Sequence, residues 1–292
     1  MRKLIEDYQN IKAEPEFRER IEKTMARERR KEKGRKIMKW SVSTAACVII
    51  AGVVSLNAIP SAAYALSDVP VIGQIIKVVT LGRYENDENG YHADIKTPKI
   101  EGLLDKKLED KLNSEFRENA DALIAAYEKD VKEMKKEFGD ETIHMGVESD
   151  YTVRTDNDNV LALDVYIFNV AGSSSTKHTF YNIDKKSGKL LELKDLFKKD
   201  ADYITPISAY IKEEMKKENT VNDGLFWTED DEFTEGFKNI KADQNFYINN
   251  DNRIVICFDK YEVAAGAQGC PEFEIPDSVV KDIRSNEVLH NN

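Results

Sequence analysis

The chain has 292 residues and a formal net charge of −11. This charge is unevenly distributed, because residues 1–39 carry about +6 and the chain beyond residue 65 carries about −17. An acidic surface repels nucleic acid and anionic polymers, which argues against a nucleic-acid-binding protein, and it attracts cationic proteins.

The first segment, residues 1–39, is too short to form a hydrophobic core of its own. Its side chains Phe17, Ile21 and Met25 are spaced four apart, so they fall on one face of a predicted helix. Such a helix could be solvated beside the membrane, with its basic end at anionic lipid headgroups. We favour binding of this helix to a groove of a cytoplasmic partner, because its apolar face is then buried against the partner.

Residues 40–60 are uncharged and long enough to cross a membrane as one helix. The basic residues before them place the N-terminus in the cytoplasm and the rest of the chain outside the cell. Ala63 and Ala65 form a small-x-small pattern, which is typical of signal peptidase cleavage between Ala65 and Leu66. A cleaved signal peptide is one interpretation, but the long charged segment before the span favours a signal anchor that also contains a cleavage site.

The membrane-proximal segment, residues 61–90, is predicted to contain a short amphipathic helix over residues 66–82. This helix would lie on the bilayer surface or under the outer domain. Either position would control the access of a protease to Ala65. The apolar positions that define its face are Val69, Ile72, Ile75, Ile76 and Val79.

The extracellular part is predicted to have a first part at residues 91–188 and a second part at residues 189–292. Apolar residues at helical spacing predict a long helix over 102–138 that ends at Gly139. The elements together predict an α+β fold, in which a single transmembrane helix is followed by an extracellular antiparallel sheet packed with helices. The predicted strands are 91–100, 142–155, 159–171, 176–184, 245–249 and 253–259, and further helices are predicted at 190–218 and 277–283.

The residue types that carry catalysis or bind metals form no recognisable pattern. The four histidines match no metal-ligand spacing, and no phosphate-binding or nucleophile motif is present. His144, His178 and Asp164 fall on neighbouring predicted strands, where their side chains could face one another. We favour the interpretation that they are exposed polar positions on the solvent face of the sheet. Cys257 and Cys270 either form a disulfide or remain free thiols. We expect no enzyme activity, no cofactor and no metal.

Two loops are candidates for binding a ligand, because loops on a sheet scaffold commonly carry recognition residues and glycine permits close approach. Tyr261 could instead be a core residue that caps the sheet, which is what we expect for Phe273. The candidate residues are Tyr261, Glu262, Gly266, Gln268 and Pro271 in the loop after strand 253–259, and Ser173, Ser174 and Ser175 in a second loop.

Two stretches carry a resemblance to a known family. Residues 63–84 (AYALSDVPVIGQIIKVVTLGRY) and 246–276 (FYINNDNRIVICFDKYEVAAGAQGCPEFEIP) resemble the anti-sigma factors of the RsiV type. The outer domain is also similar to a non-catalytic module found beside some peptidoglycan deacetylase domains. Ala265 departs from the family pattern, in which proline is usual, and this affects the expected shape of the loop.

The resemblance implies a signalling mechanism. The arm with Phe17, Ile21 and Met25 would hold an extracytoplasmic-function sigma factor inactive, and the two candidate loops would bind lysozyme. Binding would expose the site after Ala65 to signal peptidase, and an intramembrane site-2-type protease would then release the sigma factor. The acidic outer part suits a cationic lysozyme. The alternative is a membrane-anchored peptidoglycan-binding module without a signalling role.

Overall fold

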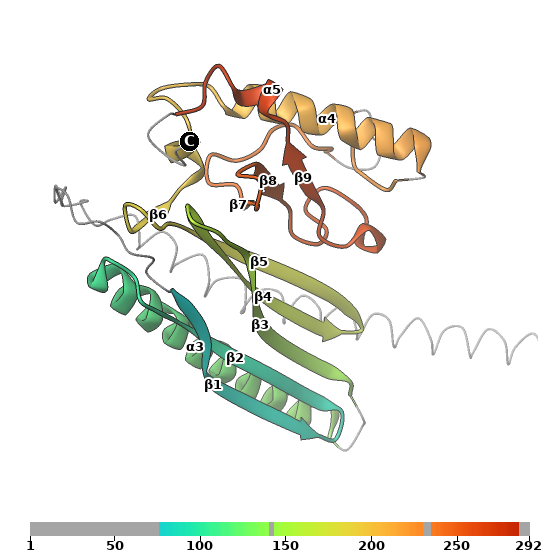
Figure 1. Ribbon diagram of the computed structural model, residues 1–292. Helices are drawn as coiled ribbons and strands as arrows, with labels where there is room; N and C mark the ends of the chain where they lie inside the picture. Colours follow the sequence, from blue (N-terminus) through green and yellow to red (C-terminus); the bar gives the residue numbers. More distant parts are fainter. Residues whose placement is uncertain (1–75, 140–142, 223, 230–234, 286–292) are drawn as a thin grey trace, which may run out of the picture.

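The structure, a computed structural model, describes residues 76–139, 143–222, 224–229 and 235–285 (Figure 1). The predicted cytoplasmic arm, the span at 40–60 and the cleavage site lie outside these residues. Within the described part, no helix is long and apolar enough to span a membrane.

A six-stranded sheet forms the first layer, in the order β1-β2-β3-β4-β5-β6. All neighbouring strands are antiparallel except β2 and β3, which are parallel because the long helix α3 (Lys106–Phe138) connects them. Figure 1 shows α3 running along this sheet beside β1 and β2. The strands are β1 (Lys77–Glu88), β2 (Tyr91–Glu101), β3 (Met145–Asp156), β4 (Val160–Ala171), β5 (Ser173–Asp184) and β6 (Lys189–Leu191).

Helix α3 covers one face of the sheet, because alternate residues of the strands are apolar on that side. Leu112 and Phe116 of α3 belong to one buried cluster with Leu161 and Leu163 of β4. The predicted helix is confirmed, but it begins at Lys106 because the Asp105 carboxylate caps its first turn.

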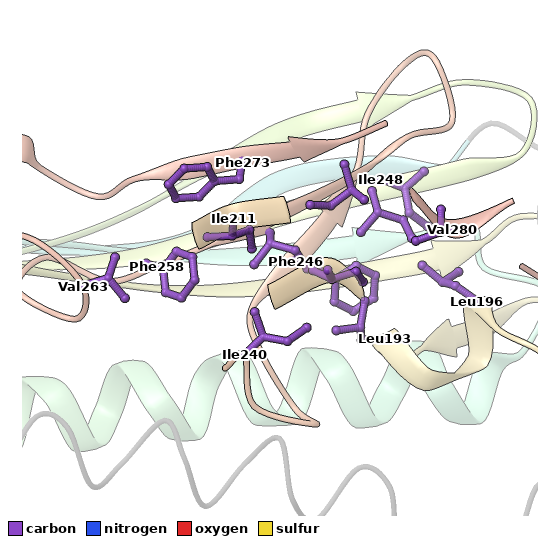
Figure 2. Close-up of a cluster of buried hydrophobic side chains, with 14 of the residues drawn as sticks. Leu193, Leu196, Ile211, Ile240, Phe246, Ile248, Phe258, Val263, Phe273 and Val280 are labelled. Carbon is purple, nitrogen blue, oxygen red and sulfur yellow. The ribbon is translucent and has the colours of Figure 1, made fainter. Parts of the chain in front are cut away.

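The second layer is a three-stranded antiparallel sheet, β7 (Phe246–Ile248), β8 (Ile254–Cys257) and β9 (Glu272–Ile275). The 3-10 turn η1 (Leu193–Leu196) and the helices α4 (Ile204–Val221) and α5 (Asp277–Val280) accompany it. Their side chains form a second core, in which Ile211, Phe246 and Phe273 are buried (Figure 2).

A buried amide connects the two sheets. Asn182 of β5 donates from Nδ2 to the carbonyl oxygen of Phe246 at 2.9 Å and accepts from the N–H of Ile248 at 3.0 Å. Because Asn182 is fully buried, the edge of β7 is held against β5 by paired polar groups.

The α+β class with antiparallel strands and helices is confirmed for the described residues.

Three predicted elements differ from the structure. Residues 77–82, predicted as part of an amphipathic helix, are the first half of β1, because they pair with β2 from Lys77 opposite Glu101 onwards. The segment 190–203 is not α-helical, because it contains the end of β6 and the 3-10 helix η1, and α4 begins only at Ile204. The predicted loop after strand 253–259 contains β9, which adds a third strand to the second sheet.

The prediction that Ser173, Ser174 and Ser175 form a loop is also wrong. Ser173, Ser174 and Ser175 are the first residues of β5 and pair with Ala171, Val170 and Asn169 of β4. Gly172 alone makes the connection, with a φ of 74° that favours glycine.

Candidate ligand-binding surface

The structure brings the two predicted ligand-binding segments together. The hydroxyl groups of Tyr261 and Ser173 lie 3.0 Å apart, and Lys260 Nζ donates to Ser174 Oγ at 2.7 Å. The Lys260 N–H also donates to the Thr176 carbonyl oxygen at 3.3 Å. The loop after β8 therefore lies on the start of β5, whereas Ser175 is half-buried in the ladder opposite Asn169.

Tyr261 is the most constrained exposed residue of this surface. Its φ is 68°, a left-handed conformation that is unusual for a bulky side chain. Its side chain is nevertheless 44% exposed, so burial in the core does not explain the conformation. Backbone strain of this kind persists only where the surroundings enforce it, and it is frequent at binding sites.

Gly266 makes room for the Tyr261 ring. A Cβ atom at position 266 would lie 2.3 Å from a carbon of this ring, which is far inside contact distance. Gly266 begins the 3-10 turn η2 (Gly266–Gln268), so the aromatic ring rests directly on the backbone of this turn. The sequence predicted both residues at the site, but it did not predict that they are in contact.

The remaining predicted residues have structural partners. Gln268 is exposed, and its Oε1 accepts from the Leu225 N–H at 3.4 Å. Pro271 is buried, and its carbonyl oxygen accepts from the Phe258 N–H at 2.9 Å. Phe273 is buried against Phe226 and Phe258, so its predicted place in the core is confirmed.

A buried charge network lies beside the loop. The Asp164 carboxylate is only 1% exposed, and it lies 2.9 Å from His178 Nδ1 and 2.9 Å from Arg154 Nη2. The same Arg154 atom lies 2.9 Å from Glu272 on β9. The prediction of exposed polar positions is therefore wrong for Asp164 and His178, whereas His144 is exposed.

The imidazole of His178 is held in its charged form. Burial opposes its protonation, but hydrogen bonds with Asp164 and Cys270 outweigh burial and raise the pKa of His178 to about 10. Cys270 is half-buried and Cys257 is buried, and both are free thiols. In the described ranges no cluster of three or more His, Cys, Asp or Glu side chains could hold a metal ion.

Two family models match the chain. The first, described as "Protein of unknown function (DUF3298)", matches residues 194–278, and the second, "Deacetylase PdaC", matches residues 84–173. A solved structure of a DUF3298 family member from Bacteroides fragilis has a TM-score of 0.54 and 17% identity, and covers 73% of this chain and 94% of its own. The fold is therefore that of the DUF3298 proteins.

Sequence relatives define the family more narrowly. The chain is 35% identical to the anti-sigma-V factor RsiV of Bacillus subtilis, over 98% of this chain and 97% of that protein. It is 23% identical to the peptidoglycan-N-acetylmuramic acid deacetylase PdaC of the same organism, over 62% of this chain but only 38% of the deacetylase. The chain belongs to the RsiV family of anti-sigma factors, and a sigma factor is the partner that this family implies.

Proposed function

We propose that the chain is a membrane-bound anti-sigma factor that senses lysozyme through the surface around Tyr261. The observation that carries this proposal is the exposed Tyr261 side chain, which is fixed in a left-handed conformation between Ser173 and Gly266. Tyrosine is enriched among the residues that dominate binding energy, and a fixed side chain loses little entropy when it binds.

Charge supports a cationic ligand. The chain beyond residue 65 carries about −17, and opposite charges on two proteins accelerate their encounter. A lysozyme of high positive charge fits this requirement.

In the proposed signalling step, lysozyme binding is thermodynamically coupled to exposure of the cleavage site. Lysozyme would favour a conformation in which signal peptidase reaches the bond after Ala65, and this shift requires tighter binding to that conformation. An intramembrane site-2-type protease would then cut the span and release the sigma factor from Phe17, Ile21 and Met25. β1 is the edge strand of the sheet, so it pairs with β2 on one side only, and most of its side chains are exposed.

The test is binding of lysozyme to the full chain, compared between the wild type and the variant Tyr261→Ala. We expect the variant to lose at least about tenfold in affinity, as for a central interface residue. Leu81→Ala is the matched control, because Leu81 is 43% exposed against 44% for Tyr261 and lies on β1 at the far edge of the sheet. Equal affinities for all three chains would exclude this surface.

A second candidate is a membrane-anchored peptidoglycan-binding module without a signalling role. The match of residues 84–173 to the deacetylase family model favours it. Purification of the chain from cells separates the two functions, because only the anti-sigma factor brings a sigma subunit with its cytoplasmic arm.

A further inference from the structure

Two hydrogen bonds close the turn that carries Tyr261. The Asp259 N–H donates to Oε2 of Glu262 at 2.9 Å, and the Glu262 N–H donates to the Asp259 carbonyl oxygen at 3.0 Å. Lys260 and Tyr261 are the two residues between them, so their backbone is confined from both sides. We call residues 259–262 the tyrosine turn.

Besides the side-chain contacts of Lys260 with Ser174 and of Tyr261 with Ser173, two further hydrogen bonds attach the tyrosine turn to β5. Asp259 Oδ1 accepts from the His178 N–H at 2.9 Å, and the Lys260 N–H donates to the Thr176 carbonyl oxygen at 3.3 Å. These bonds align the turn with the start of β5, which places the Tyr261 hydroxyl beside Ser173.

The carboxylate of Glu262 is occupied by partners within the chain. Oε2 accepts from the Asp259 N–H, while Oε1 lies 2.7 Å from Lys241 Nζ, so the negative charge is paired. Glu262 is half-buried, whereas Tyr261 is exposed. A cationic ligand would have to displace Lys241 to reach this carboxylate.

We propose that Glu262 is a positioning residue, which acts on the ligand only through the conformation of Tyr261. This inference rests on the proposed function and reassigns a residue that the sequence pattern placed among the ligand contacts. Lysozyme binding then requires the Glu262 side-chain oxygen that accepts from the Asp259 N–H. It does not require the negative charge of Glu262.

Two substitutions at the same position separate the oxygen from the charge. Glu262→Gln keeps a side-chain oxygen for the Asp259 N–H, whereas Glu262→Ala removes it. We expect lysozyme affinity of the full chain to stay within about twofold for Glu262→Gln and to fall about tenfold for Glu262→Ala. Glu274→Ala removes an equal charge from β9, where it is paired with Arg253 just before β8, and should bind as the wild type does. A direct ionic contact predicts equal losses for both Glu262 variants and would overturn the proposal.

A double-mutant cycle with Tyr261 completes the test. If Glu262 acts through Tyr261, then Glu262→Ala adds no further loss in a Tyr261→Ala background. Additive losses would overturn the proposal even though the surface binds lysozyme. A wild-type chain that does not bind lysozyme would instead refute the proposed function.

Hydrogen exchange gives a readout without the ligand. In the full chain, amides of residues 258–263 should exchange faster in Glu262→Ala than in Glu262→Gln, while amides of α4 remain unchanged. Unchanged exchange at the tyrosine turn in both variants would also overturn the positioning role. If Glu262→Ala exchanges faster throughout, Glu262→Gln decides alone, because a loss of more than about twofold in its lysozyme affinity would overturn the proposal.

Discussion

At the scale of single residues, the absence of a side chain at position 266 is as important as the presence of Tyr261. Gly266→Ala would place a methyl group within 2.3 Å of the tyrosine ring, so the ring or the turn must move. We expect lysozyme affinity to fall about tenfold, with the melting temperature nearly unchanged, because the surface is exposed. Gly82→Ala is a suitable control, since nothing lies within 4 Å of the added atom.

The Asp164–His178 pair makes a second prediction, about stability and pH. The pKa of His178 rises from 6.5 in the unfolded chain to about 10 in the folded one. Its stabilising effect is therefore complete below pH 6.5 and is lost as the pH rises towards 10. The groups that face the ring are the Asp164 carboxylate of β4 and the Cys270 thiol, and Arg154 of β3 pairs with Asp164.

Denaturant unfolding of the full chain between pH 6.5 and 10 measures this effect. The free energy of unfolding should fall with pH in the wild type and fall less steeply in His178→Gln. Identical slopes for the two chains would contradict a charged His178, because the lysines and tyrosines that titrate in the same range are common to both.

At the scale of elements, sequence patterns with a local cause were predicted well. The helix over 102–138 was predicted from its apolar residues at helical spacing and the glycine after its end, and both signals act within a few residues. Its start was placed too early because the cap at Asp105 was not used. The first half of strand β1 was mistaken for a helix because Val79 continues the helical spacing of Ile72, Ile75 and Ile76 in the sequence. Only pairing with β2 makes residues 77–82 a strand, and sequence spacing does not show pairing.

The candidate surface also could not be predicted in full, because sequence spacing does not show contacts between distant residues. Tyr261, Gly266 and the serines were identified from loop composition, but Tyr261 and Ser173 are 88 positions apart, and only the fold brings them into contact. For the same reason an exposed position was favoured for Asp164 and His178 over their facing one another, and Arg154 was not identified as part of their network. Polar residues alternating with apolar ones on β4 and β5 are typical of an exposed sheet face, and the second sheet covers this face only in the folded chain.

At the scale of the whole molecule, net charge and the local site should control different steps of binding. The charge of about −17 beyond residue 65 acts over distances comparable to the Debye length, about 10 Å at 0.1 M salt. Tyr261 acts only in contact, and Lys260 Nζ, 5.3 Å from the centre of its ring, adds a positive charge at the site itself. Attraction of a cationic ligand must therefore come from the wider surface.

We predict that the lysozyme association rate falls about tenfold between 0.05 and 0.5 M salt, while the dissociation rate changes little. Tyr261→Ala should raise the dissociation rate and leave the salt dependence of association as in the wild type, because the variant keeps every charge. Stopped-flow or surface-based kinetics across a salt series measures both rates. An association rate that does not respond to salt would contradict electrostatic attraction of the ligand. A wild-type dissociation rate in Tyr261→Ala would contradict a contact between Tyr261 and lysozyme.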